Sequence, residues 1–227
     1  MVAFVNVFFI VVLFFASSIT YAKSYSEELC QSNEYICYVV KRGDTWKKLF
    51  PDPDAREVVK RINRMNVPLY RGKTIAIPAN DLNNIMSHSP FPQQIDPTGQ
   101  RFIKVSVSKL AFGAYDADGT LLHWGPISGG KNYCADVRRG CRTPTGKFAI
   151  YRKQGADCKS TKFPVGKGGA PMPYCMFFKG GFAMHGSPTV PGYNDSHGCI
   201  RLFTSDAEWL NSEFTNGYAS VPVLVEK

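Results

Sequence analysis

From Arg101 onward, apolar and polar residues alternate with the period of two that is typical of half-buried strands. Ile103, Val105 and Val107 share one face of the first expected strand. A turn sequence at residues 116–119 follows the second expected strand and joins it to the third as a hairpin. Strand patterns after the first cover residues 109–115, 120–127, 146–152, 173–179, 181–185 and 218–225. The pattern predicts a β-rich domain over residues 100–227.

This domain has one convincing helix pattern, close to its end. Ser205 is followed three residues later by Glu208, which is the spacing of a capping box, and the apolar pair Trp209 and Leu210 comes next. We therefore expect one main helix, capped by Ser205.

Residues 38–80 have a different order of elements. A short β-branched run at 38–40 precedes two helix patterns, at 46–50 and 55–63, and a strand at 74–78 that ends in proline. Asp44 is the expected cap of the first helix. The order β-α-α-β within about forty residues predicts a small unit with one two-stranded sheet.

The rest of the chain divides into a leading segment and two connecting segments. Residues 1–22 are apolar and end in small residues at the −3 and −1 positions, which indicates a signal peptide; an uncleaved anchor is the alternative. Residues 23–37 form a lead-in segment. Residues 81–99 are rich in Asn, Ser, Pro and Gln and predict a linker.

The net charge of +9 is carried entirely by residues after the expected signal peptide, because residues 1–22 contain no charged side chain. We expect an exported protein of the periplasm or cell envelope. Nucleic acid is then a poor partner, and anionic envelope polymers are better ones.

The seven cysteines also favour an oxidising compartment, since the sequence contains no Cys-x-x-Cys pair that would suggest a metal site. Three disulfides would use six of them and leave one free thiol.

The chemistry is concentrated between Met184 and Leu202. Two histidines, His185 and His197, lie close in sequence to Cys199, and a thiol nucleophile needs such a base or cation. Gly198 leaves space beside the thiol, and Arg201 offers a planar cation suited to a carboxylate. A zinc site made of the two histidines and the cysteine is disfavoured, because His-x-Cys is cramped for one ion and no fourth ligand is apparent.

The string Ser196-His197-Gly198-Cys199-Ile200-Arg201, with His185-Gly186 upstream, resembles the active site of the YkuD-type L,D-transpeptidases. Residues 128–131 and 142–150 add further matches, so the resemblance runs from about residue 101 to the end of the chain. It implies a YkuD-like β-sandwich with one main helix. The interval from His185 to Ser196 is shorter than is usual in that family, so residues 189–195 must cross more tightly.

The resemblance also implies roles for these residues. Cys199 would be the nucleophile and His185 its base, oriented by the carbonyl of Gly186. His197 would assist from beside the site, and the backbone amides of Gly198 and Cys199 would form the oxyanion hole. Ser196 and Arg201 would order the loop or bind the substrate carboxylate.

Residues 38–80 resemble a LysM module, through Tyr38-Val39-Val40-Lys41-Arg42-Gly43-Asp44-Thr45, Ile62-Asn63 and the closing strand 72–78. This resemblance implies binding to β-1,4-linked N-acetylglucosamine polymers such as the glycan of peptidoglycan.

Together the two resemblances imply acyl transfer on peptidoglycan stem peptides through a thioester, with release of terminal D-alanine and no cofactor or metal. The acceptor amine would give a 3→3 cross-link or attach a protein. Water as acceptor would make the chain an L,D-carboxypeptidase or another cysteine hydrolase, and a non-catalytic wall-binding or adhesion protein is a further alternative.

With Cys199 set aside as the nucleophile, we expect the other six cysteines to pair with their nearest neighbours in sequence, as one of 15 possible arrangements. The expected pairs are Cys30 with Cys37, Cys134 with Cys141, and Cys158 with Cys175.

Overall fold

The computed structural model describes residues 24–163 and 170–227. The expected signal peptide at residues 1–22 lies outside the described residues. Among the helices that the structure does describe, none has the length and apolar character needed to cross a membrane.

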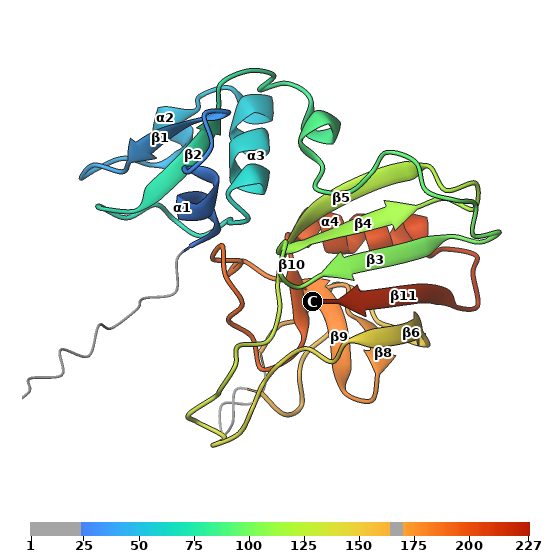
Figure 1. The fold of residues 1–227 in the computed structure, drawn as a ribbon. Helices are drawn as coiled ribbons and strands as arrows, with labels where there is room; N and C mark the ends of the chain where they lie inside the picture. Colours follow the sequence, from blue (N-terminus) through green and yellow to red (C-terminus); the bar gives the residue numbers. More distant parts are fainter. Residues whose placement is uncertain (1–23, 164–169) are drawn as a thin grey trace, which may run out of the picture.

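The C-terminal half is built on one sheet, to which the described residues contribute nine strands (Figure 1). The hydrogen-bonded order is β6-β11-β3-β4-β5-β10-β9-β8-β7. The β-rich character expected from the alternating pattern is therefore confirmed. The strands are β3 (Phe102–Ser106), β4 (Ala111–Tyr115), β5 (Leu121–Ser128), β6 (Gly146–Ile150), β7 (Arg152–Lys153), β8 (Met176–Lys179), β9 (Phe182–Gly186), β10 (Ile200–Leu202) and β11 (Val221–Glu226).

This sheet curls until its two edges meet, whereas a sandwich of two stacked sheets was expected. β6 lies at one edge and β7 at the other, yet Tyr151 alone separates them in the chain. The Tyr151 amide donates a 3.0 Å hydrogen bond to the carbonyl oxygen of Phe177 in β8. The described residues of this domain thus form one strongly curved sheet, and its main buried cluster includes Ile103, Met184 and Phe214.

The helix that covers this core begins two residues earlier than the sequence suggested. Helix α4 (Thr204–Trp209) is preceded by Phe203, and the π-helix η2 (Leu210–Phe214) continues it. Ser205 therefore lies inside the helix and does not cap it. Glu208 accepts a 2.8 Å hydrogen bond from the Tyr174 hydroxyl, so the predicted capping box is wrong.

Residues 35–78 fold in the expected β-α-α-β order, and we call them the βααβ unit. Its elements are β1 (Tyr35–Val39), α2 (Trp46–Leu49), α3 (Pro53–Ile62) and β2 (Thr74–Pro78). The two strands are antiparallel, with Tyr35 opposite Pro78 and Val39 opposite Thr74. Buried Asn63 joins α3 to β2 through two 2.7 Å hydrogen bonds with the backbone of Ala76.

The cap of α2 differs from the expectation. The side chain of Thr45 accepts from the Lys48 amide and caps the helix. Asp44 instead accepts 2.8 Å hydrogen bonds from the Lys41 amide and from the hydroxyl of Tyr38. These bonds hold the pKa of Asp44 below its ordinary value, the Lys41 amide contributing most.

The two connecting segments are both structured. The lead-in segment contains helix α1 (Tyr25–Leu29). The expected linker at residues 81–99 contains the 3₁₀-helix η1 (Ile85–His88) and Phe91, which is buried in a cluster with Trp124. The linker sequence therefore packs along the sheet domain.

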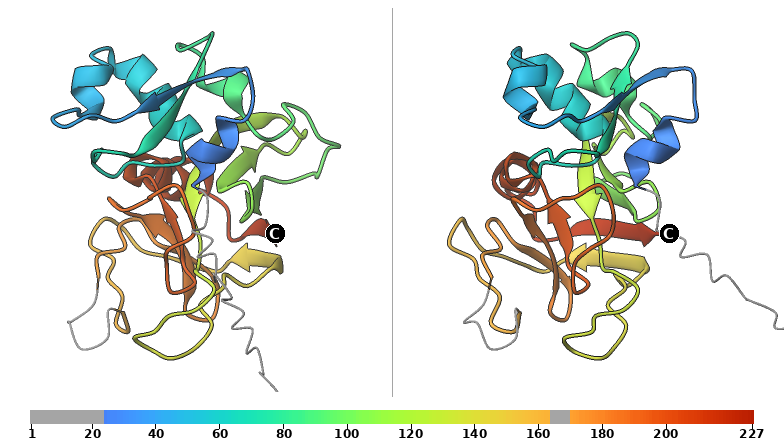
Figure 2. Two further views of the ribbon diagram at one scale, coloured as in Figure 1. Left: turned by 60° about the vertical axis from the view of Figure 1, so that its left-hand side comes forward. Right: turned by 90° about the vertical axis from the view of Figure 1, so that its left-hand side faces the viewer.

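A buried ion pair joins the βααβ unit to the sheet domain, which lie one above the other in Figure 2. Arg61 of α3 donates to both carboxylate oxygens of Asp206 in α4, at 3.0 and 2.7 Å. Asp206 also lies 2.9 Å from Nε2 of His123 in β5. Burial raises the pKa of Asp206, but Arg61 and His123 outweigh it and hold the pKa below its ordinary value. The junction is thus a fixed interface.

We expect Arg61→Ala to destabilise the folded chain by about 3–5 kcal/mol, because Asp206 would stay buried without its charge partner. Urea unfolding followed by tryptophan fluorescence measures the change. The matched control is Glu57→Ala, which removes the partly exposed ion pair with the same arginine and should cost less than about 1 kcal/mol. Equal effects of the two substitutions would contradict the assignment of the junction to Asp206.

Candidate active site

The parallel pairing of β9 and β10 brings two distant parts of the sequence together. Ile200 lies opposite Met184 and Arg201 lies opposite His185. Cys199 immediately precedes β10, so the same register places it beside Ala183, two residues before His185 in β9. The topology therefore places the thiol and the imidazole in one region of the sheet.

His185 is buried and is oriented by its neighbour. Its Nδ1 lies 2.9 Å from the carbonyl oxygen of Gly186, so Nδ1 carries the proton and Nε2 is left as the acceptor. The pKa of His185 is lowered to about 4, chiefly by burial; the Gly186 hydrogen bond opposes this decrease, and the charge of Arg201 adds to it. The imidazole is therefore neutral at pH 7 and able to accept a proton.

Cys199 is the free cysteine of the described chain and is half-buried. Burial raises the pKa of its thiol, and a hydrogen bond from the Ala183 backbone and the charge of Arg201 oppose the increase. Within the described residues Sγ is directed at the Gly181 carbonyl, 3.9 Å away, and not at His185. If the two act together, a protonated thiol and a neutral imidazole require proton transfer at the moment of attack.

The turn before Cys199 is held by Ser196. Its hydroxyl accepts a 2.9 Å hydrogen bond from the Gly198 amide and donates to the carbonyl of Cys199. Gly198 has a φ of +120°, and a Cβ there would lie 2.4 Å from the ring of Phe182. Glycine is thus required by backbone conformation and by packing on Phe182, whereas the sequence suggested open space for a substrate carbonyl.

A second support of this turn was not singled out from the sequence. The Thr143 hydroxyl donates to the carbonyl of Gly198 at 3.0 Å and accepts from the Gly130 amide at 2.8 Å. A Cβ on Gly130 would lie 1.7 Å from the carbonyl oxygen of Cys141. Both residues fall in the strings that carried the family resemblance, which was the available signal.

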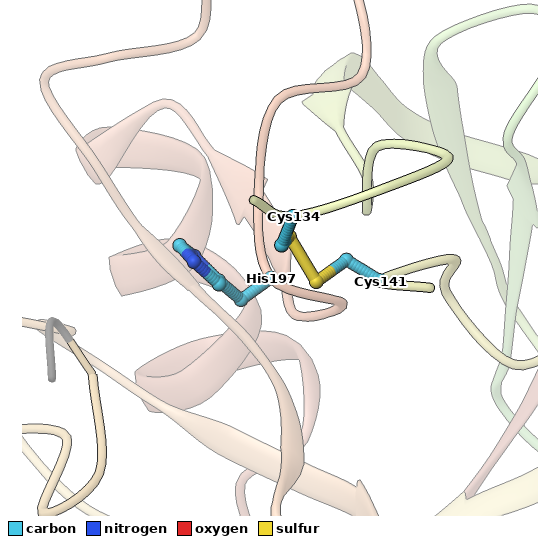
Figure 3. A group of neighbouring side chains, drawn as sticks. All are labelled: Cys134, Cys141 and His197. Atoms are coloured by element: carbon cyan, nitrogen blue, oxygen red, sulfur yellow. A yellow bond between two sulfur atoms is a disulfide. The ribbon is translucent and has the colours of Figure 1, made fainter. Parts of the chain in front are cut away.

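His197 lies next to the disulfide of Cys134 and Cys141 (Figure 3) and contacts the loop that this disulfide closes. Its Nε2 lies 2.7 Å from the carboxylate of Asp136, and its ring stacks on Phe163 with centroids 4.7 Å apart. The hydrogen bond to His197 is the largest of the effects that lower the pKa of Asp136. Nothing in the sequence pattern pointed to Asp136 as its partner.

Among the described residues, one group has the arrangement of metal ligands, namely Cys134, Cys141 and His197. The two sulfurs are bonded to each other, as Figure 3 shows, and so are not thiolate ligands. The zinc set weighed from the sequence, His185 with His197 and Cys199, does not form such a group in this part of the chain.

Arg201 is paired with the loop that leads into the site. Its Nη1 lies 3.2 Å from the Thr189 carbonyl and 3.4 Å from the Asp195 carboxylate. Lys131 approaches the same carboxylate at 3.6 Å. Two cations thus share one acidic side chain beside the turn.

The other cysteines form the pairs Cys30–Cys37, Cys134–Cys141 and Cys158–Cys175. The second pair lies against the Ser196 to Cys199 turn, with the Cys134 sulfur 4.0 Å from the Ser196 carbonyl. The third belongs to the buried cluster on which Cys199 packs. The disulfides therefore buttress the site from two sides.

Comparison with known protein families gives the decisive observation. The family model described as YkuD, the L,D-transpeptidase catalytic domain, matches residues 100–225. The chain belongs to the YkuD family. This YkuD chain is accordingly an L,D-transpeptidase enzyme by family, and the matched residues include the whole site described above.

One solved structure supports the fold, and two others are noted for their similarity alone. The L,D-transpeptidase of Xylanimonas cellulosilytica shares 24% identity at a TM-score of 0.54, over 70% of this chain and 74% of that one. The L,D-transpeptidase of Stackebrandtia nassauensis shares 21% identity at a TM-score of 0.47, over 61% of each chain. An Enterococcus faecium L,D-transpeptidase shares 26% identity at a TM-score of 0.45, over 56% of this chain and 50% of its own. No curated protein matches the chain.

Proposed function

We propose that the chain transfers acyl groups between peptidoglycan stem peptides through a thioester on Cys199. The thiolate attacks the carbonyl of the third, diamino acid residue as His185 takes the thiol proton. The C–N bond to the terminal D-alanine breaks, and His185 returns the proton to the leaving amine. An acceptor amine then attacks the thioester, forms the new amide and regenerates the thiol.

The state of His185 carries this proposal. Its Nδ1 is held by Gly186 and burial keeps its pKa at about 4, so Nε2 is a free acceptor at neutral pH. The parallel register of β9 and β10 supports the same pairing, because it brings this base to the strand that follows Cys199.

The oxyanion in this scheme relies on the Cys199 amide. The Gly198 amide is already donated to the Ser196 hydroxyl at 2.9 Å, so it holds the turn in shape. His197 helps to position the acceptor through the loop at residues 134–141, which it contacts by its hydrogen bond with Asp136. Preorganised donors of this kind are worth about 10²–10³ in rate.

The two cations near the turn support a carboxylate-bearing substrate. Arg201 and Lys131 share Asp195, and a stem peptide brings carboxylates at its C-terminus and on its diamino acid. Arg201 would both order the loop and attract the substrate. The proposal also covers domain organisation and location. We propose a glycan-binding module at residues 38–80, a linker at 81–99 and a catalytic domain at 100–227. A signal peptide at residues 1–22 would direct the protein to the cell envelope.

We also propose that the βααβ unit binds the glycan strand as a LysM module. The observed β-α-α-β order and antiparallel pairing support this role. Its surface presents exposed apolar side chains, Ile36, Val39 and Tyr70, which suit the apolar faces of sugar rings. Sedimentation of the full chain with purified sacculi tests it, with soluble N-acetylglucosamine oligomers as competitor.

We expect the oxidised protein to convert tetrapeptide muropeptides into cross-linked dimers, with release of one D-alanine for each bond. Mass spectrometry of the products distinguishes the alternatives. Tripeptides without dimers would indicate an L,D-carboxypeptidase. An intact substrate together with full binding to sacculi would favour a non-catalytic wall-binding protein.

A further inference from the structure

We propose that Asn66, in the βααβ unit, is a positioning residue for the reaction at Cys199, because it clamps the loop that joins the base to the nucleophile turn. This loop is residues 187–195, between β9 and Ser196. The inference rests on the proposed roles of His185 and Cys199, and it makes the βααβ unit part of the catalytic centre as well as a glycan-binding module.

Asn66 bonds to the loop at two separate points. Its Nδ2 donates to the Ser187 carbonyl at 2.8 Å, and its Oδ1 accepts from the Val190 amide at 2.9 Å. Its own amide donates to the Val190 carbonyl at 3.0 Å. The Asn66 side chain thus bonds to two backbone groups of the loop, and the Asn66 amide bonds to a third.

The surrounding packing fixes the same contact. Met65 pairs with Pro191 in an isolated bridge, and both Met65 and Val190 are buried. The carbonyl of Gly192 accepts from the Tyr25 amide at 3.3 Å. The loop is therefore held along most of its length by residues that precede the sheet domain in the sequence.

Both bonded points lead directly to site residues. Ser187 follows Gly186, whose carbonyl orients His185, so fixing the Ser187 carbonyl fixes the adjoining peptide plane. Val190 follows Thr189, whose carbonyl accepts from Arg201. Asn66 thus sets the geometry at the base and at the cation through single peptide steps.

The clamp is rigid because its support is rigid. Asn66 lies four residues after Ile62, the end of α3, and α3 is locked to α4 by Arg61 and Asp206. Misplacing a reacting group by about 1 Å costs about 10²-fold in rate. Loss of a group that holds a ligand or base from behind costs about 10–100-fold.

The test measures alkylation of Cys199 by iodoacetamide, which requires no peptidoglycan. We expect Asn66→Ala to slow alkylation about 10-fold at pH 7, where attack depends on His185 as base. The difference between Asn66→Ala and the wild type should narrow as the pH rises, because a growing fraction of the thiol then ionises without the base. The groups that bear on His185 are Gly186 by hydrogen bond and Arg201 by charge, and the substitution replaces neither residue, so it can act on them only through their positions.

Two further variants make the result decisive. Asn80→Ala removes an exposed asparagine of the same half and should leave the rate unchanged. In a His185→Gln background, Asn66→Ala should have little additional effect, because the two act through the same base. An unchanged rate in Asn66→Ala, a deficit that persists at high pH, or an equal loss in both backgrounds would overturn the clamp. If the wild type alkylates as expected but ignores tetrapeptides, the proposed substrate fails and the clamp stands.

Discussion

Cys199→Ala is expected to lower transfer between tetrapeptide muropeptides by about 10⁴-fold or more, to the level of the reaction without enzyme. The thioester cannot form without the sulfur, and in the described chain the other six cysteines are held in disulfides. Product formation measured by liquid chromatography and mass spectrometry gives the rate.

The disulfides supply the control for this variant. Thiol titration of the unreduced protein should find one reactive thiol in the wild type and none in Cys199→Ala. Cys199→Ser, which keeps the shape of the side chain, should bind substrate and turn it over far more slowly. Appreciable transfer by Cys199→Ala would contradict the assignment of the nucleophile.

His185→Gln is expected to lower the same rate by about 10²–10⁴-fold at pH 7, the range for loss of a general base. The pKa of His185 is about 4, so its neutral form dominates above about pH 5 and the wild-type rate should be level from there to neutral pH. As the pH falls through the pKa the imidazole gains a proton, and the rate should decline.

The pH profile of the variant separates catalysis from misfolding. Without the base, attack depends on spontaneous ionisation of a thiol whose pKa burial raises, so the rate should climb about tenfold for each pH unit. His123→Gln is the matched control, since that histidine contacts Asp206 and not the site. A level profile for His185→Gln would mean that another group accepts the proton.

The strands and the nucleophile string could be predicted from the sequence because both are local. Alternation places Ile103 and Val105 on one face, and Cys199 lies within six residues that carry the family resemblance. β10 was missed, since three residues are too few to show a period and its pairing with β9 is parallel. The start of the helix was misplaced because the spacing of Ser205 and Glu208 suits a capping box, although both residues lie inside the helix.

What could not be predicted are the contacts between distant residues. Arg61 and Asp206 are 145 positions apart, and nothing in either neighbourhood names the other. Asn66 and Ser187 are 121 apart, and Asp136 and His197 are 61 apart. Each contact exists because the closed sheet and the docked βααβ unit bring the segments together.

The acyl-enzyme itself gives the most direct test. The oxidised protein is mixed with a tetrapeptide donor without acceptor, quenched in acid within seconds, and measured by intact mass and peptide mapping. The mechanism predicts a mass increase equal to the donor acyl group, without its terminal D-alanine, on the peptide that contains Cys199. A modified residue elsewhere, or dimer formation in a protein that never carries the adduct, would contradict it.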